Sequence, residues 1–120
     1  MTVLNEIHHA GCFIVSEEEN NYSRDQITLL TGHGVLQPGT VLGQITASNK
    51  YIPALAGAVD GSQTAKAILY GYADTTSADV IATAITRLAQ VRASDLTVDS
   101  SLTATYAAQL AAVDGPIIVR

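Results

Sequence analysis

Tryptophan, phenylalanine and cysteine are almost absent from this sequence of 120 residues. It contains no tryptophan, one phenylalanine (Phe13) and one cysteine (Cys12), and only 14% of its residues are charged. A single cysteine excludes an internal disulfide and is typical of a reducing compartment. The 48% of hydrophobic residues is carried mainly by Ala, Val, Ile and Leu. With nine glycines and little charge, this composition favours one small β-rich domain with tight turns over a charged helical bundle.

Clusters of positive charge and long apolar runs are also missing. The formal net charge is −5, and the six Lys and Arg residues are scattered singly along the chain. Because phosphate contacts need clustered cations, this pattern argues against direct nucleic-acid binding. No apolar run approaches the roughly 18 residues that span a bilayer, and residues 1–11 lack the features of a secretory signal. We therefore expect a cytosolic protein without membrane contact.

Short apolar segments alternate with turn residues over the middle of the chain. Pro38-Gly39 predicts a type II turn, because Pro fixes φ and Gly accepts the positive φ that follows. Ser48-Asn49 predicts a second turn, which would join two strands as a hairpin. The predicted strands are residues 26–31, 41–46, 50–53 and 65–73. The strand at residues 65–73 is expected to be central in its sheet.

The C-terminal part contains one ambiguous segment and one clearer helix. Apolar positions in residues 79–92 fit a helical stripe and also the alternation of a strand, and from this pattern alone we favour a helix. Residues 101–112 predict a helix, because Asp99-Ser100 suits its N-cap and Gly115-Pro116 ends it. The last four residues predict a short apolar strand.

The first 25 residues differ in character from the remainder. They contain an acidic run at residues 17–19 and only short apolar pieces, the most prominent around Phe13. We interpret residues 1–25 as an extended N-terminal arm, poorly ordered alone, with a strand-like segment at residues 11–16. A simple solvated tail is the alternative, although it would leave the chain's only phenylalanine in water. Residues 26–120 would form the compact β-rich body.

Reactive side chains are few and form no recognisable site. Cys12 with His8 and His9 is the one arrangement that could suggest a thiol nucleophile or a metal site. Adjacent residues on an extended chain point to opposite faces, and this spacing matches no closed zinc set. The acidic run lacks the turn glycine and alternating oxygens of a calcium loop, and His33 between two glycines is interpreted as a turn residue. We predict no catalytic residue, no metal and no cofactor.

Several short segments, none of them specific alone, follow one another in an order that spans nearly the whole chain. They are His9-Ala10-Gly11, Phe13 to Glu17, Ser23-Arg24-Asp25, Leu36 to Gly43, Ile68 to Asp74, Leu88 to Val91, Leu96-Thr97 and Gly115 to Arg120. As a set they resemble the lambda-type head decoration protein family of tailed phages. The resemblance implies a mainly β (α+β) fold with one short C-terminal helix, and strands at residues 79–92. Pro116 departs from the family pattern and, having no N–H, leaves open how the final strand begins to pair.

The resemblance also implies a function without catalysis. Proteins of this family form homotrimers that bind three-fold and quasi-three-fold positions of the expanded head and reinforce it against packaged DNA. The expected partners are further copies of the chain and the major capsid protein, on the outer capsid surface of a virion made in the host cytoplasm. A generic small β-barrel binding module, monomeric or dimeric, is the alternative.

The arm is the predicted capsid contact, because an extended segment can add to an exposed sheet edge and three arms in a trimer act together. Ser23-Arg24-Asp25 would anchor the arm to the body, or would be no more than an Arg–Asp pair in a loop. The predicted contact residues are His9, Gly11, Phe13, Ile14, Val15, Ser16, Ser23, Arg24 and Asp25.

Overall fold

Strands account for most of the regular structure. A computed structural model of the chain describes residues 10–17, 23–113 and 115–120. Its elements, in chain order, are β1 (Ile14–Glu17), β2 (Arg24–Leu29), β3 (Val35–Leu36), β4 (Val41–Gln44), β5 (Tyr51–Pro53), β6 (Ala65–Leu69), β7 (Ala73–Asp74), β8 (Val80–Ile85), β9 (Ala89–Val91), two 3-10 turns (Ala93–Asp95 and Ser100–Leu102), α1 (Tyr106–Ala111) and β10 (Ile117–Val119). The expected mainly β fold with one short C-terminal helix is confirmed.

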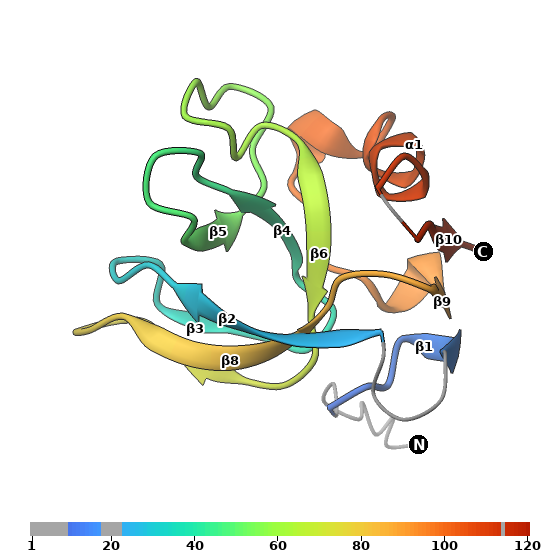
Figure 1. The fold of residues 1–120 in the computed structure, drawn as a ribbon, viewed down its shortest axis with the longest axis horizontal. Helices are drawn as coiled ribbons and strands as arrows, with labels where there is room; N and C mark the ends of the chain where they lie inside the picture. The colour runs from blue at the N-terminus through green and yellow to red at the C-terminus, as the bar shows by residue number, and fades with distance from the viewer. Residues whose placement is uncertain (1–9, 18–22, 114) are drawn as a thin grey trace, which may run out of the picture.

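Five strands close into a barrel in the order β2-β5-β4-β6-β8. The longest pairing joins β2 and β8, which run antiparallel from Arg24↔Ile85 to Leu29↔Val80 and form the long ribbon in Figure 1. Strands β2 and β5 meet in parallel through the single pair Leu29↔Tyr51, which closes the barrel. Strand β6 lies between β4 and β8, so the prediction of a central strand there is confirmed.

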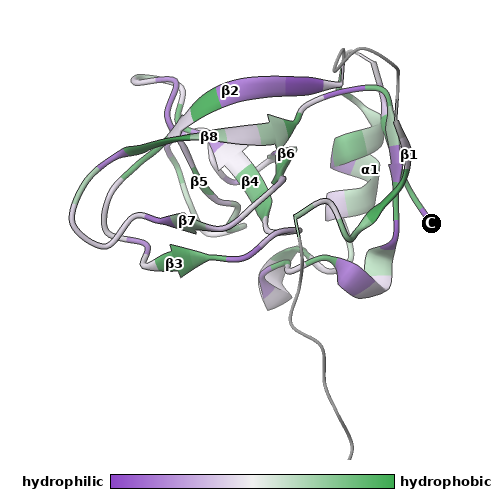
Figure 2. Cartoon of the chain, turned by 90° about the horizontal axis from the view of Figure 1, so that it is seen from below, coloured by the Kyte–Doolittle hydropathy of each residue, from purple (hydrophilic) through white to green (hydrophobic). Residues whose placement is uncertain are grey.

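Two smaller sheets accompany the barrel. Strands β1, β9 and β10 form a three-stranded sheet in the order β1-β9-β10, and β3 pairs with β7 in a two-stranded sheet. Helix α1 packs against β10 and β6. Figure 1 shows the three-stranded sheet and α1 together at one side of the barrel, and Figure 2 shows β3 and β7 away from them. The molecule therefore has a barrel with a separate layer on one side.

The barrel strands nearest this layer are buried on both faces. In β4, Val41 belongs to the cluster between the barrel and the α1 layer, whereas Leu42 belongs to the cluster inside the barrel. In β6, Ile68 belongs to the cluster between the barrel and the α1 layer, and Leu69 belongs to the cluster inside the barrel. Because successive side chains of a strand point to opposite faces, two cores can share one strand. The near-continuous apolar character of these segments follows from that double burial.

The Pro38-Gly39 turn forms as predicted. The N–H of Thr40 donates to the C=O of Gln37 at 3.2 Å, and Gly39 has φ of +90°. A Cβ atom at Gly39 would lie 2.6 Å from the carbonyl oxygen of Asp95. Glycine is therefore required here both for its backbone conformation and for the close approach of a second segment.

Residues 79–92 form strands β8 and β9 and not a helix. The helix favoured from periodicity is wrong, and the strands implied by the family resemblance are confirmed. The segment passes from the barrel into the second sheet through Leu88, whose φ is +53°. Strand β8 is covered on one side by β2 along its whole length, so tertiary pairing decides between two periodicities that the sequence supports equally.

The predicted helix at residues 101–112 is shorter than expected. Residues 100–102 form a 3-10 turn, in which the Asp99 carboxylate accepts a hydrogen bond from the Ser101 N–H at 2.9 Å. Only Tyr106–Ala111 is α-helical, beginning after Thr105. Asp99 does act as an N-cap, but it caps the 3-10 turn at residues 100–102, which ends before α1 begins.

The final strand is confirmed, and Pro116 does not disturb it. Strand β10 pairs in parallel with β9 from Ile117↔Ala89 onward. The residue before the proline, Gly115, already accepts a hydrogen bond from the Leu88 N–H at 3.0 Å. Pro116 thus lies just before the first paired residue, where a missing N–H costs no ladder bond.

We predict that Phe13→Ala destabilises the fold by about 3–5 kcal/mol, because it removes a fully buried ring and leaves a cavity. Phe13 is 0% exposed and belongs to the cluster between the barrel and α1. Urea unfolding measures the loss, and Phe13→Leu, which keeps most of the volume, should lose clearly less. A loss within about 0.5 kcal/mol, as for an ordinary surface residue, would contradict the burial.

Candidate functional site

Of the predicted arm residues that the structure describes, some are packed into the body and others are exposed. His9 lies outside the described residues, as do His8 and most of the acidic run. Phe13 is fully buried, and its C=O accepts a hydrogen bond from the Arg92 N–H at 2.7 Å. The Phe13 ring therefore lies in the chain's own core, and a capsid contact by Phe13 stays a prediction.

Strand β1 presents one row of side chains inward and another outward. Ile14 pairs with Val91 and packs against the core, and the register then shifts between Ile14 and Ser16. This bulge, which inserts an extra residue, leaves Val15 48% exposed and Ser16 exposed as well. Of the three large apolar residues among the predicted contacts, Phe13, Ile14 and Val15, only Val15 thus has a large exposed surface.

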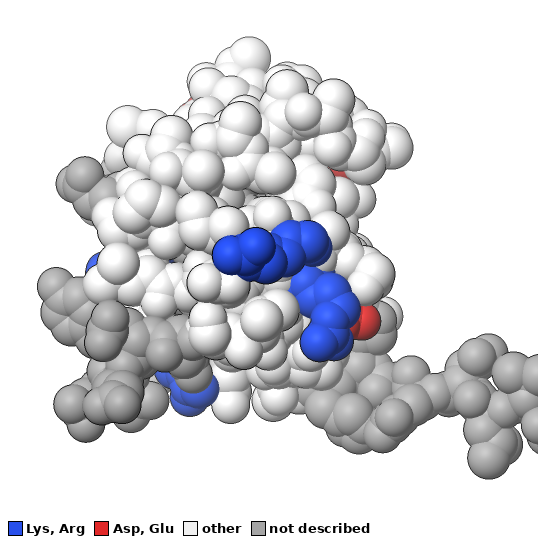
Figure 3. Space-filling view, turned by 90° about the vertical axis from the view of Figure 1, so that its right-hand side faces the viewer, with Lys and Arg blue, Asp and Glu red and all other residues white. Residues whose placement is uncertain are grey.

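The outward row continues across all three strands of this sheet. Ser16 pairs with Gln90 of β9, and Gln90 pairs with Ile118 of β10. Ile118 is 40% exposed, while its neighbour Ile117 is fully buried. Figure 3 views this side of the molecule: basic side chains lie near its centre, and most of the described surface around them is uncharged.

Polar contacts fix this face of the sheet. The Arg120 side chain donates from Nε to the Gln90 side chain at 2.7 Å, and the Arg92 guanidinium pairs with Asp95 at 2.9 Å. The backbone of Arg120 is held too, because its C=O accepts a hydrogen bond from the Ala93 N–H at 2.9 Å. The face therefore combines exposed aliphatic side chains with a few ordered polar groups, a composition suited to protein contact.

Ser23 lies in the turn just before β2, and Arg24 and Asp25 are the first two residues of the strand. Ser23 is fully buried, and its C=O accepts a hydrogen bond from the Thr86 N–H at 2.9 Å. Asp25 accepts a hydrogen bond from the Thr86 hydroxyl at 2.8 Å and forms an ion pair with Arg87. These contacts tie the segment to the end of β8, and its role as the anchor of the arm stays a prediction.

The residue that sequence reasoning missed is Tyr70. The guanidinium of Arg24 lies 4.2 Å from the centroid of its ring, and Gly11 lies against the same ring. The sequence placed Tyr70 only in a predicted central strand, and no local pattern linked it to residues so distant in the chain. Its contacts with two predicted arm residues follow from the tertiary fold alone.

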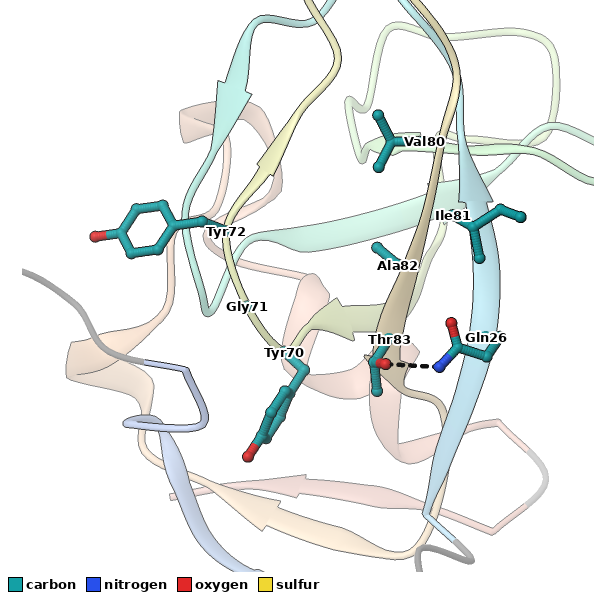
Figure 4. A pocket seen from close by; sticks show the side chains of 8 residues that line it. All are labelled: Gln26, Tyr70, Gly71, Tyr72, Val80, Ile81, Ala82 and Thr83. Carbon is teal, nitrogen blue, oxygen red and sulfur yellow. Dashed lines mark hydrogen bonds between the residues drawn. The ribbon is translucent and has the colours of Figure 1, made fainter.

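A hollow of about 270 Å³ lies beside Tyr70, on the outside of β8. Figure 4 shows the side chains around it, with Gln26 donating to the Thr83 hydroxyl at 2.9 Å. One of them, Ile81, is 73% exposed. Among the described residues, the lining contains no carboxylate, histidine or cation, so these residues offer apolar and hydrogen-bonding contacts. The lining residues are Gln26, Tyr70, Gly71, Tyr72, Val80, Ile81, Ala82 and Thr83.

Shifted pKa values occur at turns and barrel contacts away from the three-stranded sheet. Hydrogen bonds from Lys50, at 2.6 Å, and from the Thr31 N–H hold the pKa of Asp79 below its ordinary value. Burial, followed by the negative charge of Asp25, raises the pKa of Tyr51. These shifts in pKa are explained by local hydrogen bonds, by burial and by neighbouring charges. They do not identify an acid–base pair.

The described residues form neither a metal-binding cluster nor a membrane-spanning helix. No group of three His, Cys, Asp or Glu side chains within residues 10–17, 23–113 and 115–120 is arranged to hold a metal ion. In the same part of the chain, no helix is long and apolar enough to cross a membrane. Cys12 is a free, half-buried thiol.

Comparison with known proteins identifies the family. No curated protein matches the chain. The model of one protein family, described as "Bacteriophage lambda head decoration protein D", matches residues 3–115. The match spans the barrel, the second sheet as far as β9, and α1, and it agrees with the β-rich fold described above. Proteins of this family are structural components of the phage virion that bind its capsid, and the chain belongs to the bacteriophage lambda head decoration protein D family.

Proposed function

We propose that this protein forms homotrimers that bind three-fold and quasi-three-fold positions on the outer surface of the expanded phage head. Bound there, the trimers reinforce the shell against the pressure of packaged DNA, after synthesis of the chain in the host cytoplasm. The observation that carries the proposal is the family match over residues 3–115. The role needs no catalysis, cofactor or metal, and the contacts described above are of the kind that protein–protein binding uses.

The capsid contact is assigned to the N-terminal segment and the outward row of β1. In the order β1-β9-β10, β1 is at the edge of its sheet among the described strands. An edge strand carries backbone groups that a strand of a partner can pair with, and its exposed side chains give register. Val15 and Ser16 are those side chains. His9 and Gly11 belong to the segment that leads into the strand.

The remaining predicted contact residues are proposed to hold the neighbouring parts of the chain in place. Phe13 and Ile14 hold β1 against the core. Ser23, Arg24 and Asp25 fix the start of β2 to the body through the contacts with Thr86, Arg87 and Tyr70. We therefore propose two roles: some of these residues contact the capsid, and the others hold the contact residues in place.

We predict that the purified protein pellets with expanded heads of its phage and not with unexpanded heads. Co-sedimentation measures this directly. Deleting residues 2–9 should weaken binding while the unfolding midpoint stays unchanged, because the deletion stops before the buried Phe13. Equal binding to both forms of the head would contradict the proposed function, and full binding by the truncated chain would contradict the role of the N-terminal segment.

We predict that Val15→Asp weakens head binding by about tenfold, the loss typical of one contact residue at the centre of an interface. The substitution places a charge on the exposed face of β1, where Val15 is 48% exposed, so the fold should tolerate it. Val59→Asp is the matched control, since Val59 is 96% exposed and lies in the connection between β5 and β6. If both variants bind equally well, β1 is not a contact.

We predict a trimer in solution, with a mass about three times the 12.5 kDa of one chain. Sedimentation equilibrium or native mass spectrometry measures it. Val15→Asp should leave this mass unchanged, because the proposal assigns Val15 to the capsid. A strict monomer or dimer would favour the generic β-barrel binding module instead.

A further inference from the structure

Two arginines meet at the end of the three-stranded sheet. The N–H of Arg120 donates to the C=O of Val91 at 2.8 Å, and its C=O accepts a hydrogen bond from the Ala93 N–H at 2.9 Å. These two bonds extend the parallel register of β9 and β10 by one residue, so Arg120 lies opposite Arg92. Opposite residues of a sheet project to the same face. The fold therefore brings together two cations that are far apart in the sequence.

The face that carries the two arginines is the outward face of the sheet. Gln90 of β9 and Ile118 of β10 belong to its outward row. Because alternate residues of a strand share a face, Arg92 and Arg120, two positions further along each strand, project outward as well, and both are exposed. Figure 3 shows basic side chains adjoining one another near the centre of this side, with an acidic side chain beside them. The arginines thus continue the surface that begins with Val15 on β1.

Each guanidinium is held by one polar neighbour and keeps other donors unused. Nη1 of Arg92 lies 2.9 Å from the Asp95 carboxylate, yet the Arg92 side chain is still 56% exposed. Nε of Arg120 donates to the Gln90 side chain at 2.7 Å. Neither guanidinium makes a further hydrogen bond to the residues that the structure describes, although each carries five N–H donors. Guanidiniums that are already oriented in this way suit a carboxylate, which accepts two parallel hydrogen bonds from such a group.

The two neighbouring positive charges are unfavourable for the chain by itself. Like charges directly opposite each other in a sheet destabilise it, and Asp95 compensates for only one of the two arginines. The chain has six Lys and Arg residues in all and a formal net charge of −5. A protein that is acidic as a whole therefore presents two of its few cations side by side, on the face whose β1 row is assigned to the capsid. A negatively charged group from outside the chain would compensate for the second charge.

We propose that Arg92 and Arg120 form a carboxylate-binding pair, and that the partner they fit is an acidic segment of the major capsid protein on the expanded head. The inference rests on the proposed function and names the chemistry of the partner at the surface assigned there. It is carried by charge complementarity and by continuity with the exposed aliphatic side chains Val15 and Ile118. In such a contact the apolar side chains contribute affinity, while the charges orient the partner and speed its association.

The test compares two double variants that lose the same charge. The arginine variant, Arg92→Gln with Arg120→Gln, removes one cation that is paired with an aspartate and one that is not. The lysine variant, Lys50→Gln with Lys66→Gln, does the same on the barrel, because Lys50 pairs with Asp79 at 2.6 Å and Lys66 is exposed on β6. Since the net charge changes equally, any difference in binding reports the local contact. Dissociation constants for expanded heads are measured by co-sedimentation at low and high salt, with thermal unfolding and trimer mass recorded alongside.

We expect the arginine variant to bind expanded heads about tenfold more weakly than the unmodified protein at low salt. The lysine variant should stay within about twofold of the unmodified protein. The difference between the two variants should shrink at high salt, because salt screens the attraction between exposed charges. The unfolding midpoint and the trimer mass of the arginine variant should stay unchanged.

The carboxylates of the head are tested from the opposite side of the contact. Expanded heads are treated with a carbodiimide and excess glycinamide, which convert exposed carboxylates into neutral amides, and control heads receive glycinamide alone. The unmodified protein should bind the amidated heads about as weakly as the arginine variant binds the control heads. The arginine variant should bind both kinds of head equally, because it lacks the groups that contact the carboxylates.

The results separate failure of the inference from failure of the proposed function. If the unmodified protein does not bind expanded heads, the proposed function fails and the inference fails with it. If it binds but the arginine and lysine variants lose affinity equally, only the carboxylate contact is overturned. That contact is also overturned if amidation weakens the unmodified protein and the arginine variant by the same factor. Loss of the trimer or a lower unfolding midpoint in the arginine variant would overturn it too, since the pair would then contact a second copy or support the fold.

Discussion

The double burial of the central barrel strands is the constraint on which the rest of the structure depends. Val41 and Leu42, adjacent in β4, belong to different hydrophobic clusters, as do Ile68 and Leu69 in β6. Without the layer of β1, β9, β10 and α1, one of these faces would be exposed to water. The chain has few large aromatic side chains with which to cover it, and its only phenylalanine is used for this purpose.

That constraint bears on how one short strand can complete the fold and, under the proposed function, also contact the phage head. Because β1 belongs to the covering layer, its inner residue Ile14 must complete the core, together with Phe13 just before the strand. The register shift after Ile14 then turns Val15 and Ser16 outward. The opposite side of such a surface is packed core, and a surface that is already held in place loses little freedom when it binds.

Much of the fold was predictable from the sequence, and the errors have physical causes. The strands near residues 26–31 and 41–46 and the Pro38-Gly39 turn are encoded locally, by β-branched residues and by the φ preferences of Pro and Gly. The strands in residues 79–92 are not encoded locally, because the apolar positions there fit both a helical period and the alternation of a strand. Only the pairing of β8 with β2 decides in favour of the strand. The candidate site was less predictable still. Whether Phe13 faces a partner or the core, and which residue lies beside Arg24, depends on contacts between distant parts of the chain.

The parallel pairing of β10 with β9, and the antiparallel pairing of β9 with β1, have a consequence for the order of folding. Ile14 of β1 pairs with Val91 of β9, and β9 pairs in turn with Ile117–Val119 of β10. Contacts between such distant segments carry a high loop-closure cost and slow the folding of the chain. During translation, β1 is synthesised long before either neighbour exists. The surface assigned to the capsid can therefore mature only after the last strand has left the ribosome, so an incompletely synthesised chain would not present it.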